Sequence, residues 1–302
     1  MEPSHPGAVA PERTRYVASQ RIRIHVSEWG DPAAPPLVLT HGAFDHARGF
    51  DLLAPLLADD YRVVAVDHRG HGDSDWADGY GWLNDLLDLA MVIRDLGTPV
   101  FLLGHSKGGG QALDVANSFP HLVRRVVSLD GFGPPLDGYE IDGRPPREGE
   151  VPERFAEFLD ARRDAHDHPG WRTYAAVEEL VARRARQNPR LSEDWLHYFA
   201  SCGAKEVDGG VTWKMDPAVR GGFGPFKAEW IAPGWRSLSV PVLALFGTEE
   251  DFWSIPHEVM HHRLDHIPVV ERDAVADAGH FIHMEQPEAT ADRVRAFLEA
   301  DR

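Results

Sequence analysis

The feature that most constrains the fold is a serine set between two glycines, where an apolar run meets a helical pattern. Val100–Leu103 reads as a buried strand, the segment GHSKG (residues 104–108) follows it directly, and a small-residue helical pattern continues to residue 120. A residue on such a strand-to-helix turn adopts a strained backbone, and the flanking glycines remove β-carbons that would collide with it. The pattern predicts that Ser106 projects from the carboxyl end of a sheet as a nucleophile.

Apolar runs alternate with helix-like segments along most of the 302 residues. Runs typical of strands buried on both faces occupy residues 35–42, 61–70, 99–106, 123–131 and 240–248, and residues 21–30 alternate as an edge strand does. This order predicts an α/β fold that is doubly wound around a mostly parallel sheet.

The alternation fails between about Pro134 and Ser237, where a Pro/Gly/charge-rich stretch precedes new helical patterns and a tryptophan-rich run. We therefore expect a flexible N-terminal arm at residues 1–15, a core built from residues 16–134 and 238–302, and an inserted cap, or lid, at residues 135–237.

Composition excludes several classes of partner. The formal net charge of −17 disfavours nucleic acid and anionic membrane surfaces. No apolar run approaches the roughly 20 residues of a membrane helix, and the first 20 residues lack the pattern of a secretory signal. Cys202 is the one cysteine, so an intrachain disulfide is impossible. These features predict a cytoplasmic protein that acts on a small molecule.

A serine hydroxyl is a weak nucleophile at neutral pH, so it needs a base and a group that orients the base. His280 stands in a Gly-His turn before the C-terminal helical pattern and is the predicted base, with His283 as second choice. Asp251 follows the last apolar run and is the predicted orienting acid. Glu250 and Asp130, which ends an earlier run, remain alternatives.

A second motif competes with this interpretation. HEVMH, at residues 257–261, matches the H-E-x-x-H pattern in which two histidines bind zinc and the glutamate acts as base. No third ligand follows at a clear spacing, and with 17 histidines a chance match is on the order of one in ten. The sequence therefore predicts neither a metal site nor another cofactor.

Four motifs in this order resemble the α/β-hydrolase fold superfamily: HGAF (41–44), DHRGHGDS (67–74), GHSKGG (104–109) and GHFIHMEQPE (279–288). The resemblance covers residues 22–298 apart from the cap. It implies an eight-stranded sheet, a helical lid between the sixth and seventh strands, and the chain order serine, acid, histidine. The chain departs from the family at the acid, because the family position is Glu250 and Asp251 comes one residue later.

The residues and the resemblance together predict a serine hydrolase that cleaves a small, mostly apolar carboxylic ester. Ser106 attacks the carbonyl while His280 takes its proton, and Asp251 holds the imidazole in the right tautomer. Related epoxide hydrolases and haloalkane dehalogenases carry an aspartate nucleophile where this chain has Ser106, which disfavours those two activities.

The backbone N–H groups of Ala43 and Lys107 are the expected oxyanion hole, and Phe44 is expected to line the substrate site. The same groups would also serve a lactone, amide or C–C bond hydrolase, or an acyltransferase. A small-molecule binding protein with little turnover is a further alternative.

Overall fold

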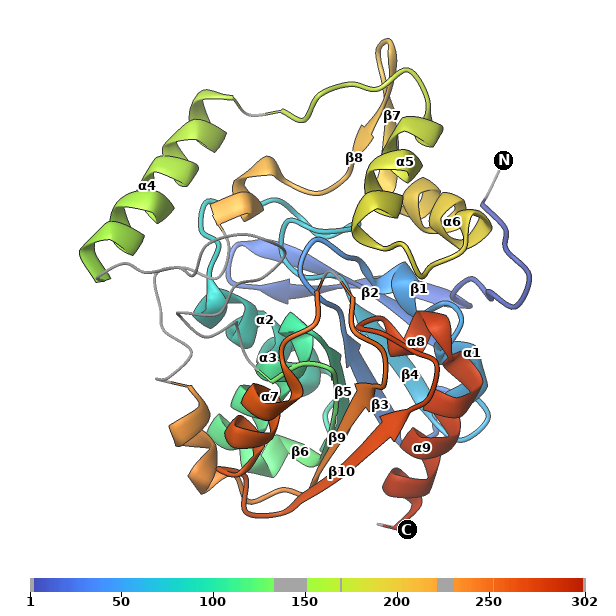
Figure 1. The fold of residues 1–302 in the computed structure, drawn as a ribbon, viewed down its shortest axis with the longest axis vertical. Helices are drawn as coiled ribbons and strands as arrows, with labels where there is room; N and C mark the ends of the chain where they lie inside the picture. The colour runs from blue at the N-terminus through green and yellow to red at the C-terminus, as the bar shows by residue number, and fades with distance from the viewer. Residues whose placement is uncertain (1–2, 133–150, 169, 222–230, 252, 301–302) are drawn as a thin grey trace.

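The computed structural model describes residues 3–132, 151–168, 170–221, 231–251 and 253–300. One sheet of eight strands has the order β1-β2-β4-β3-β5-β6-β9-β10 (Figure 1). Its strands are β1 (Arg13–Ser19), β2 (Ile22–Trp29), β3 (Pro36–Thr40), β4 (Arg62–Val66), β5 (Val100–His105), β6 (Val123–Leu129), β9 (Val242–Gly247) and β10 (Val270–Val275). The pairs β1–β2 and β2–β4 are antiparallel, and the other neighbours are parallel. The predicted mostly parallel α/β architecture is confirmed.

Helices cover both faces of this sheet. One face is covered by α2 (Trp82–Asp95), α3 (Lys107–Ser118) and α7 (His257–Leu264), and the other by α1 (Ala54–Leu57) and α9 (Pro287–Glu299). The short helix α8 (Ile282–Glu285) precedes α9. Within the described residues, no helix combines the length and the apolar character that a membrane crossing requires.

The strand sequences explain this two-faced packing. Successive side chains of a strand point to opposite faces, so a strand covered on both sides needs a continuous apolar run. In β3, Val38 packs into the core on the α2–α3 side, while Leu37 and Leu39 pack into the core on the α1–α9 side. All three side chains are fully buried. The sheet is therefore a rigid base whose carboxyl end positions the loops that follow β3, β5 and β6.

Two strands were not expected from their own sequences, and both lie at an edge of the sheet. β1 and β10 leave most of their residues partly or fully exposed, so their apolar patterns are weak. β1 begins at Arg13, within the arm expected at residues 1–15. The Val9 carbonyl accepts a hydrogen bond from Trp29 Nε1 at 2.9 Å, so this part of the arm is attached to the body.

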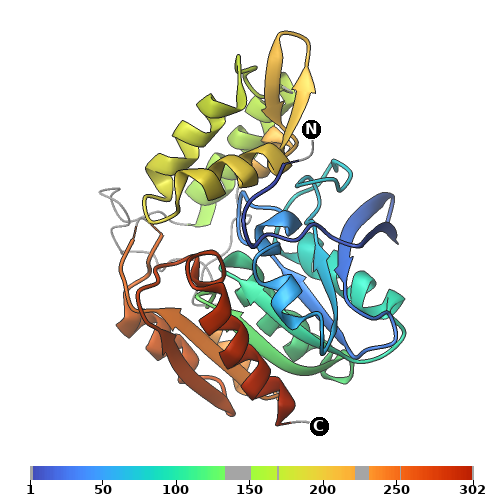
Figure 2. The same cartoon turned by 90° about the vertical axis from the view of Figure 1, so that its right-hand side faces the viewer.

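The chain leaves the sheet after β6 and returns to it at β9. Within residues 151–168 and 170–221, this insertion comprises α4 (Val151–Asp167), α5 (Val177–Gln187), α6 (Glu193–Gly203) and an antiparallel hairpin of β7 (Ala204–Val207) and β8 (Gly210–Trp213). Figures 1 and 2 show the insertion lying over one end of the sheet. The expected boundary at residue 135 lies outside the described residues.

Contacts between the two parts identify that end as the carboxyl end of the strands. His46, in the turn after β3, donates from Nε2 to the carbonyl of Phe199 on α6 at 3.1 Å, and the two rings stack. The turn after β4 makes a second contact, because Asp216 of the insertion donates its backbone N–H to the Gly70 carbonyl at 2.8 Å. The insertion therefore covers the place where the predicted nucleophile emerges.

Candidate active site

Ser106 stands at the junction of β5 and α3 with a strained backbone. Its φ and ψ angles are 53° and −120°, a region that residues with a β-carbon rarely occupy. A β-carbon at Gly104 would lie 2.2 Å from the Gly108 carbonyl oxygen, and one at Gly108 would lie 2.3 Å from the Thr40 carbonyl oxygen. Only glycine fits at these two positions, which is why the turn can be sharp enough to present the serine.

His280 contacts a carboxylate, and that carboxylate belongs to Asp130. The His280 Nδ1 lies 2.5 Å from Asp130 Oδ2, and both side chains are buried. Burial alone would lower the pKa of His280, but the hydrogen bond and the charge of Asp130 outweigh it and raise the pKa above 6.5. A carboxylate at Nδ1 fixes the proton on that nitrogen, which leaves Nε2 as the basic atom.

Asp251, the expected orienting acid, does not contact the imidazole, and this expectation is corrected. Its Oδ2 accepts the backbone N–H of His280 at 2.8 Å, and its Oδ1 accepts the backbone N–H of Trp253 at 2.8 Å. Asp251 comes four residues after the end of β9, within a loop, and its carboxylate accepts backbone N–H groups there. Asp130 directly follows β6 and reaches the ring from there. The other alternative, Glu250, is exposed.

Backbone contacts bring the ends of β5, β6 and β10 together around Ser106. The Ser106 N–H donates to the Leu129 carbonyl at 2.9 Å, one residue before Asp130. His105 Nε2 donates to the His280 carbonyl at 2.9 Å, and the two rings are 4.8 Å apart between centroids. The residue before the predicted nucleophile therefore contacts the backbone of the predicted base. Within the described residues, the Ser106 hydroxyl itself makes no hydrogen bond.

The turn after β3 lies against the nucleophile. A β-carbon at Gly42 would lie 3.1 Å from the Ser106 β-carbon, and Phe44 has a φ of 58° and is partly exposed. This places the Ala43 segment beside the start of α3, where Lys107 is the first helical residue. The Lys107 ammonium pairs with Asp85 at 2.6 Å, so its side chain is directed to α2.

The zinc-type motif HEVMH forms most of α7. Its two histidines, His257 and His261, are exposed, while Val259 and Met260 between them are buried in the core. Among the described residues, the clusters of three candidate metal ligands do not include either histidine. Met260 packs into the core on the α2–α3 side of the sheet.

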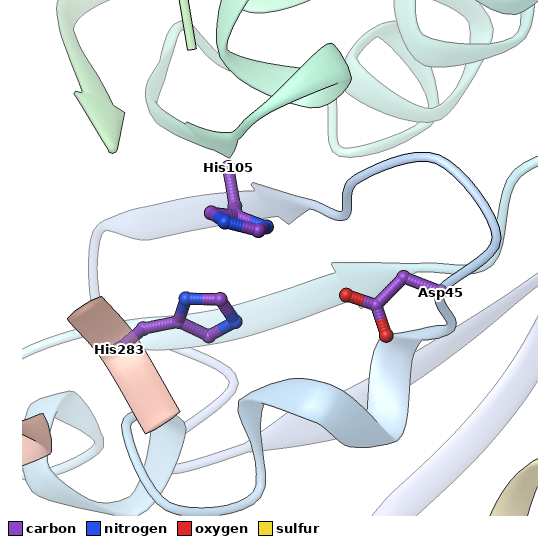
Figure 3. Close-up of side chains that lie close together, drawn as sticks. All are labelled: Asp45, His105 and His283. Carbon is purple, nitrogen blue, oxygen red and sulfur yellow. The ribbon is translucent and has the colours of Figure 1, made fainter. Parts of the chain in front are cut away.

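Asp45, His105 and His283 form a buried cluster with metal-ligand chemistry beside the nucleophile turn. Their candidate ligand atoms lie within 4.8 Å of one another, and Figure 3 shows the carboxylate and the two rings converging from separate segments. Asp45 Oδ2, His105 Nδ1 and His283 Nδ1 are buried without a hydrogen-bond partner. Burial raises the pKa of Asp45 to about 6 and lowers that of His283 to about 3. Burial also lowers the pKa of His105 well below 6.5, so both imidazole rings are neutral near pH 7.

Sequence reasoning missed Arg184, which the insertion brings to this corner. Arg184 lies on α5 and is 7% exposed, and its Nη1 donates to the Phe44 carbonyl at 3.2 Å. Its guanidinium carbon lies 4.9 Å from the Phe199 ring centroid and 5.8 Å from that of Phe281, the residue after His280. The only available signal was its position on the predicted cap, which does not distinguish it from the neighbouring arginines.

Comparison with known proteins agrees with the fold and the motifs. The model of the alpha/beta hydrolase family matches residues 37–293. The chain is 28% identical over 290 residues to 2-(acetamidomethylene)succinate hydrolase of Mesorhizobium japonicum, covering 95% of each chain. It is 31% identical over 277 residues to 3-hydroxybutyrate-oligomer hydrolase of Cupriavidus necator, covering 85% of this chain and 87% of that one.

A solved structure supports the same assignment. The crystal structure of E-2-(acetamidomethylene)succinate hydrolase is similar with a TM-score of 0.75 and 26% identity, covering 95% of this chain and 99% of that one. The two chains therefore share their fold over nearly the whole length. The chain belongs to the alpha/beta hydrolase family of enzymes.

Proposed function

We propose that the protein is a serine hydrolase that cleaves a small carboxylic ester through an acyl-enzyme intermediate. Ser106 attacks the carbonyl carbon, and His280 Nε2 takes the hydroxyl proton. Asp130 holds the imidazole through Nδ1 and stabilises its charged form. The alcohol leaves with the proton that His280 returns, and a water activated by His280 then releases the acid.

The observation that carries this proposal is the buried His280–Asp130 contact beside the strained Ser106. A serine after β5, a carboxylate after β6 and an imidazole after β10 are the parts of an acyl-transfer site. Within the described residues the serine hydroxyl makes no hydrogen bond. Catalytic hydrogen bonds often tighten only when substrate is present.

The remaining parts of the site follow from the local backbone. We assign the oxyanion hole to the backbone N–H groups of Ala43 and Lys107, which flank Ser106 from the β3 turn and the start of α3. Phe44 borders the substrate, and the inserted segment expected at residues 135–237 acts as the cap over it. A free, buried Cys202 suits a cytoplasmic location.

The names of the relatives bear on the substrate. One is named for an acetamidomethylene derivative of succinate and the other for oligomers of 3-hydroxybutyrate. Both names denote compounds that carry carboxylic acid groups. An amide hydrolase using the same residues is the second candidate, because the first name denotes a compound that contains an acetamido group.

Hydrolysis of p-nitrophenyl acetate and p-nitrophenyl butyrate tests the proposal. The wild-type protein is expected to release nitrophenol with saturation kinetics, and Ser106→Ala is expected to lose at least about 10³-fold in kcat. Ser237→Ala, a substitution of an exposed serine far along the chain, is the matched control and should leave the rate unchanged. A wild-type protein as inert as Ser106→Ala across esters, lactones and amides would support the binding-protein alternative.

A further inference from the structure

Arg184 is a cation that α5 buries against the turn after β3. Within the described part of the chain, no carboxylate oxygen lies within 4.0 Å of its guanidinium. Its Nη1 donates to a backbone carbonyl, and its Nε is buried with no acceptor. Removing a charge from water costs several kcal/mol unless a counter-charge or hydrogen bonds compensate for it. One carbonyl is poor compensation for a group with five donors.

Arg69 shows how this protein otherwise buries an arginine. Its side chain is as deeply buried as that of Arg184, and it forms two parallel hydrogen bonds to Asp88, at 2.7 and 2.8 Å. A third hydrogen bond, to the Gly79 carbonyl, occupies Nη1. The guanidinium of Arg69 forms a bidentate pair with a carboxylate, whereas within the described residues that of Arg184 does not.

The charge of Asp45 acts on Arg184, but Asp45 forms no bidentate ion pair with its guanidinium. The two groups attract each other, because the Arg184 charge opposes the rise in the Asp45 pKa that burial causes. However, Asp45 Oδ1 accepts the backbone N–H of His46, and its carboxylate faces the rings of His105 and His283 (Figure 3). A second carboxylate is therefore needed to make a bidentate pair with Arg184.

The position of Arg184 places such a carboxylate inside the substrate site. Its Nη1 holds the carbonyl of Phe44, the residue after the proposed oxyanion donor Ala43. It also lies beside Phe281, whose ring centroid is 5.1 Å from that of His280. The aromatic rings of Phe199 and Phe281 exclude water from the guanidinium, which strengthens a charge-assisted hydrogen bond.

We propose that Arg184 binds a carboxylate of the substrate, so that the preferred substrates are acyl compounds with a second, free carboxylate a few carbons from the scissile carbonyl. The proposal rests on the proposed function, because the carboxylate is positioned relative to attack by Ser106. Arginine suits this role because its planar fork matches a carboxylate bidentately and it remains charged when buried.

The kinetic test compares half-esters with neutral esters of the same acyl length. Monoethyl succinate is paired with ethyl butanoate, and monoethyl glutarate with ethyl pentanoate, with ethanol release as the readout. The wild type is expected to favour at least one half-ester in kcat/KM. Arg184→Met should lower that preference by about 10- to 100-fold, the range of a charge-assisted pair, and Arg184→Lys should retain part of it.

Arg183→Met is the matched control, because it removes the same charge from the adjacent, exposed position of α5. It should leave the preference for the half-ester unchanged. Equal preferences in Arg184→Met and Arg183→Met, or a wild type that favours the neutral esters, would overturn the proposal.

A binding measurement separates this inference from the proposed chemistry. Calorimetry with the Ser106→Ala protein measures the affinity for succinate and glutarate without turnover. Binding that is weakened at least tenfold in Ser106→Ala/Arg184→Met supports the inference even if no ester is hydrolysed, an outcome that would remove only the proposed function. If the Met variant does not fold, the same comparison with Arg184→Lys applies. No binding by Ser106→Ala at millimolar ligand, or equal binding by both proteins, overturns it.

Discussion

Two buried polar clusters in this protein use the same residue types in opposite ways. The β4 corner, made of His25, Asp67, Arg69 and Asp88, is closed. His25 Nδ1 lies 2.8 Å from Asp67 Oδ2, and Arg69 forms its paired bonds with Asp88. Asp67 also accepts the Ala47 N–H at 2.7 Å. No side-chain polar atom of these four residues is buried without a partner.

The second cluster lies beside the turn that carries Ser106 and is called the elbow corner here. It is made of Asp45, His105, His283 and Arg184, and its hydrogen bonding is incomplete. Each of the four has a buried nitrogen or oxygen atom without a hydrogen-bond partner. Unsatisfied buried polar atoms are few in native proteins and are concentrated where a ligand, water or ion completes the site. The comparison teaches that the β4 corner satisfies its own buried polar groups, whereas the elbow corner leaves buried donors and acceptors unpaired in the segments beside Ser106.

The largest expected effect separates the two candidate acids. Asp130→Asn should lower kcat by about 10⁴-fold, because an amide at Nδ1 selects the wrong tautomer of His280. Asp251→Asn should cost less than about tenfold, because an asparagine oxygen still accepts the His280 backbone N–H. Steady-state kinetics on one ester measures both. A larger loss in Asp251→Asn than in Asp130→Asn would return the orienting role to Asp251.

The two buried arginines give the next largest effect, on stability. Arg69→Met leaves the Asp88 carboxylate buried without its partner and should lower the free energy of unfolding by about 3–5 kcal/mol. Arg184→Met strands no paired carboxylate, so its effect should stay within about 1 kcal/mol. Urea unfolding of both variants gives the comparison. Equal, large losses would make Arg184 a structural residue like Arg69.

A third prediction compares one aspartate from each corner, Asp45 and Asp67. The Asp45 pKa is raised to about 6 by burial against 3.8 for the unfolded group, so ionisation costs stability increasingly between pH 4 and pH 6. Asp45→Asn should therefore be about 1–3 kcal/mol more stable than the wild type at pH 8 and equal to it near pH 4. Urea unfolding at the two pH values measures this difference.

Asp67→Asn is the control with the opposite sign. Burial by itself would raise the pKa of Asp67, but its hydrogen bond with His25 and other interactions hold that pKa below 3.8. The carboxylate then contributes stability that is present above pH 4 and is lost at lower pH. Asp67→Asn should destabilise the protein at pH 8. An Asp45→Asn protein that is destabilised at pH 8 as well would show that the elbow corner is closed in solution.

The smallest expected effect is a shift of the pH profile. The proposed base, His280, can accept a proton only when it is neutral, and its pKa is raised above 6.5 because the Asp130 contact outweighs burial. The acid limb of kcat/KM should therefore have its midpoint above pH 6.5 in the wild type. It should move to lower pH in Asp130→Asn, because the raising charge is gone. A limb at the same pH in both proteins would disconnect Asp130 from the imidazole.

The sequence predicted the parts of the site that depend on local patterns. Ser106 and its flanking glycines predict the sharp strand-to-helix turn, because that order of residues suits this backbone geometry. The acid was harder, because Asp130 and Asp251 both follow strands that end at the same edge of the sheet. The choice depends on how the loop after β9 folds back through Trp253, a contact between side chain and backbone that no spacing encodes.

Other features depend on packing between distant segments and could not be predicted from local patterns. Arg183 and Arg184 are adjacent in α5, and the tertiary fold alone decides that one is exposed and the other buried against the β3 turn. The edge strand β10 carries Glu271, Arg272 and Asp273, so its sequence lacks the apolar run of the central strands. Its place in the sheet comes from pairing with β9.

Covalent labelling tests most directly whether Ser106, next to the elbow corner, is a reactive serine. A fluorophosphonate reacts with a serine hydroxyl only when a neighbouring base activates it. Intact-mass and peptide mass spectrometry should show one adduct per chain, on Ser106, absent in Ser106→Ala and formed at least about 10²-fold more slowly in His280→Ala. An unlabelled wild type, an adduct on another residue, or equal rates with and without His280 would contradict the account.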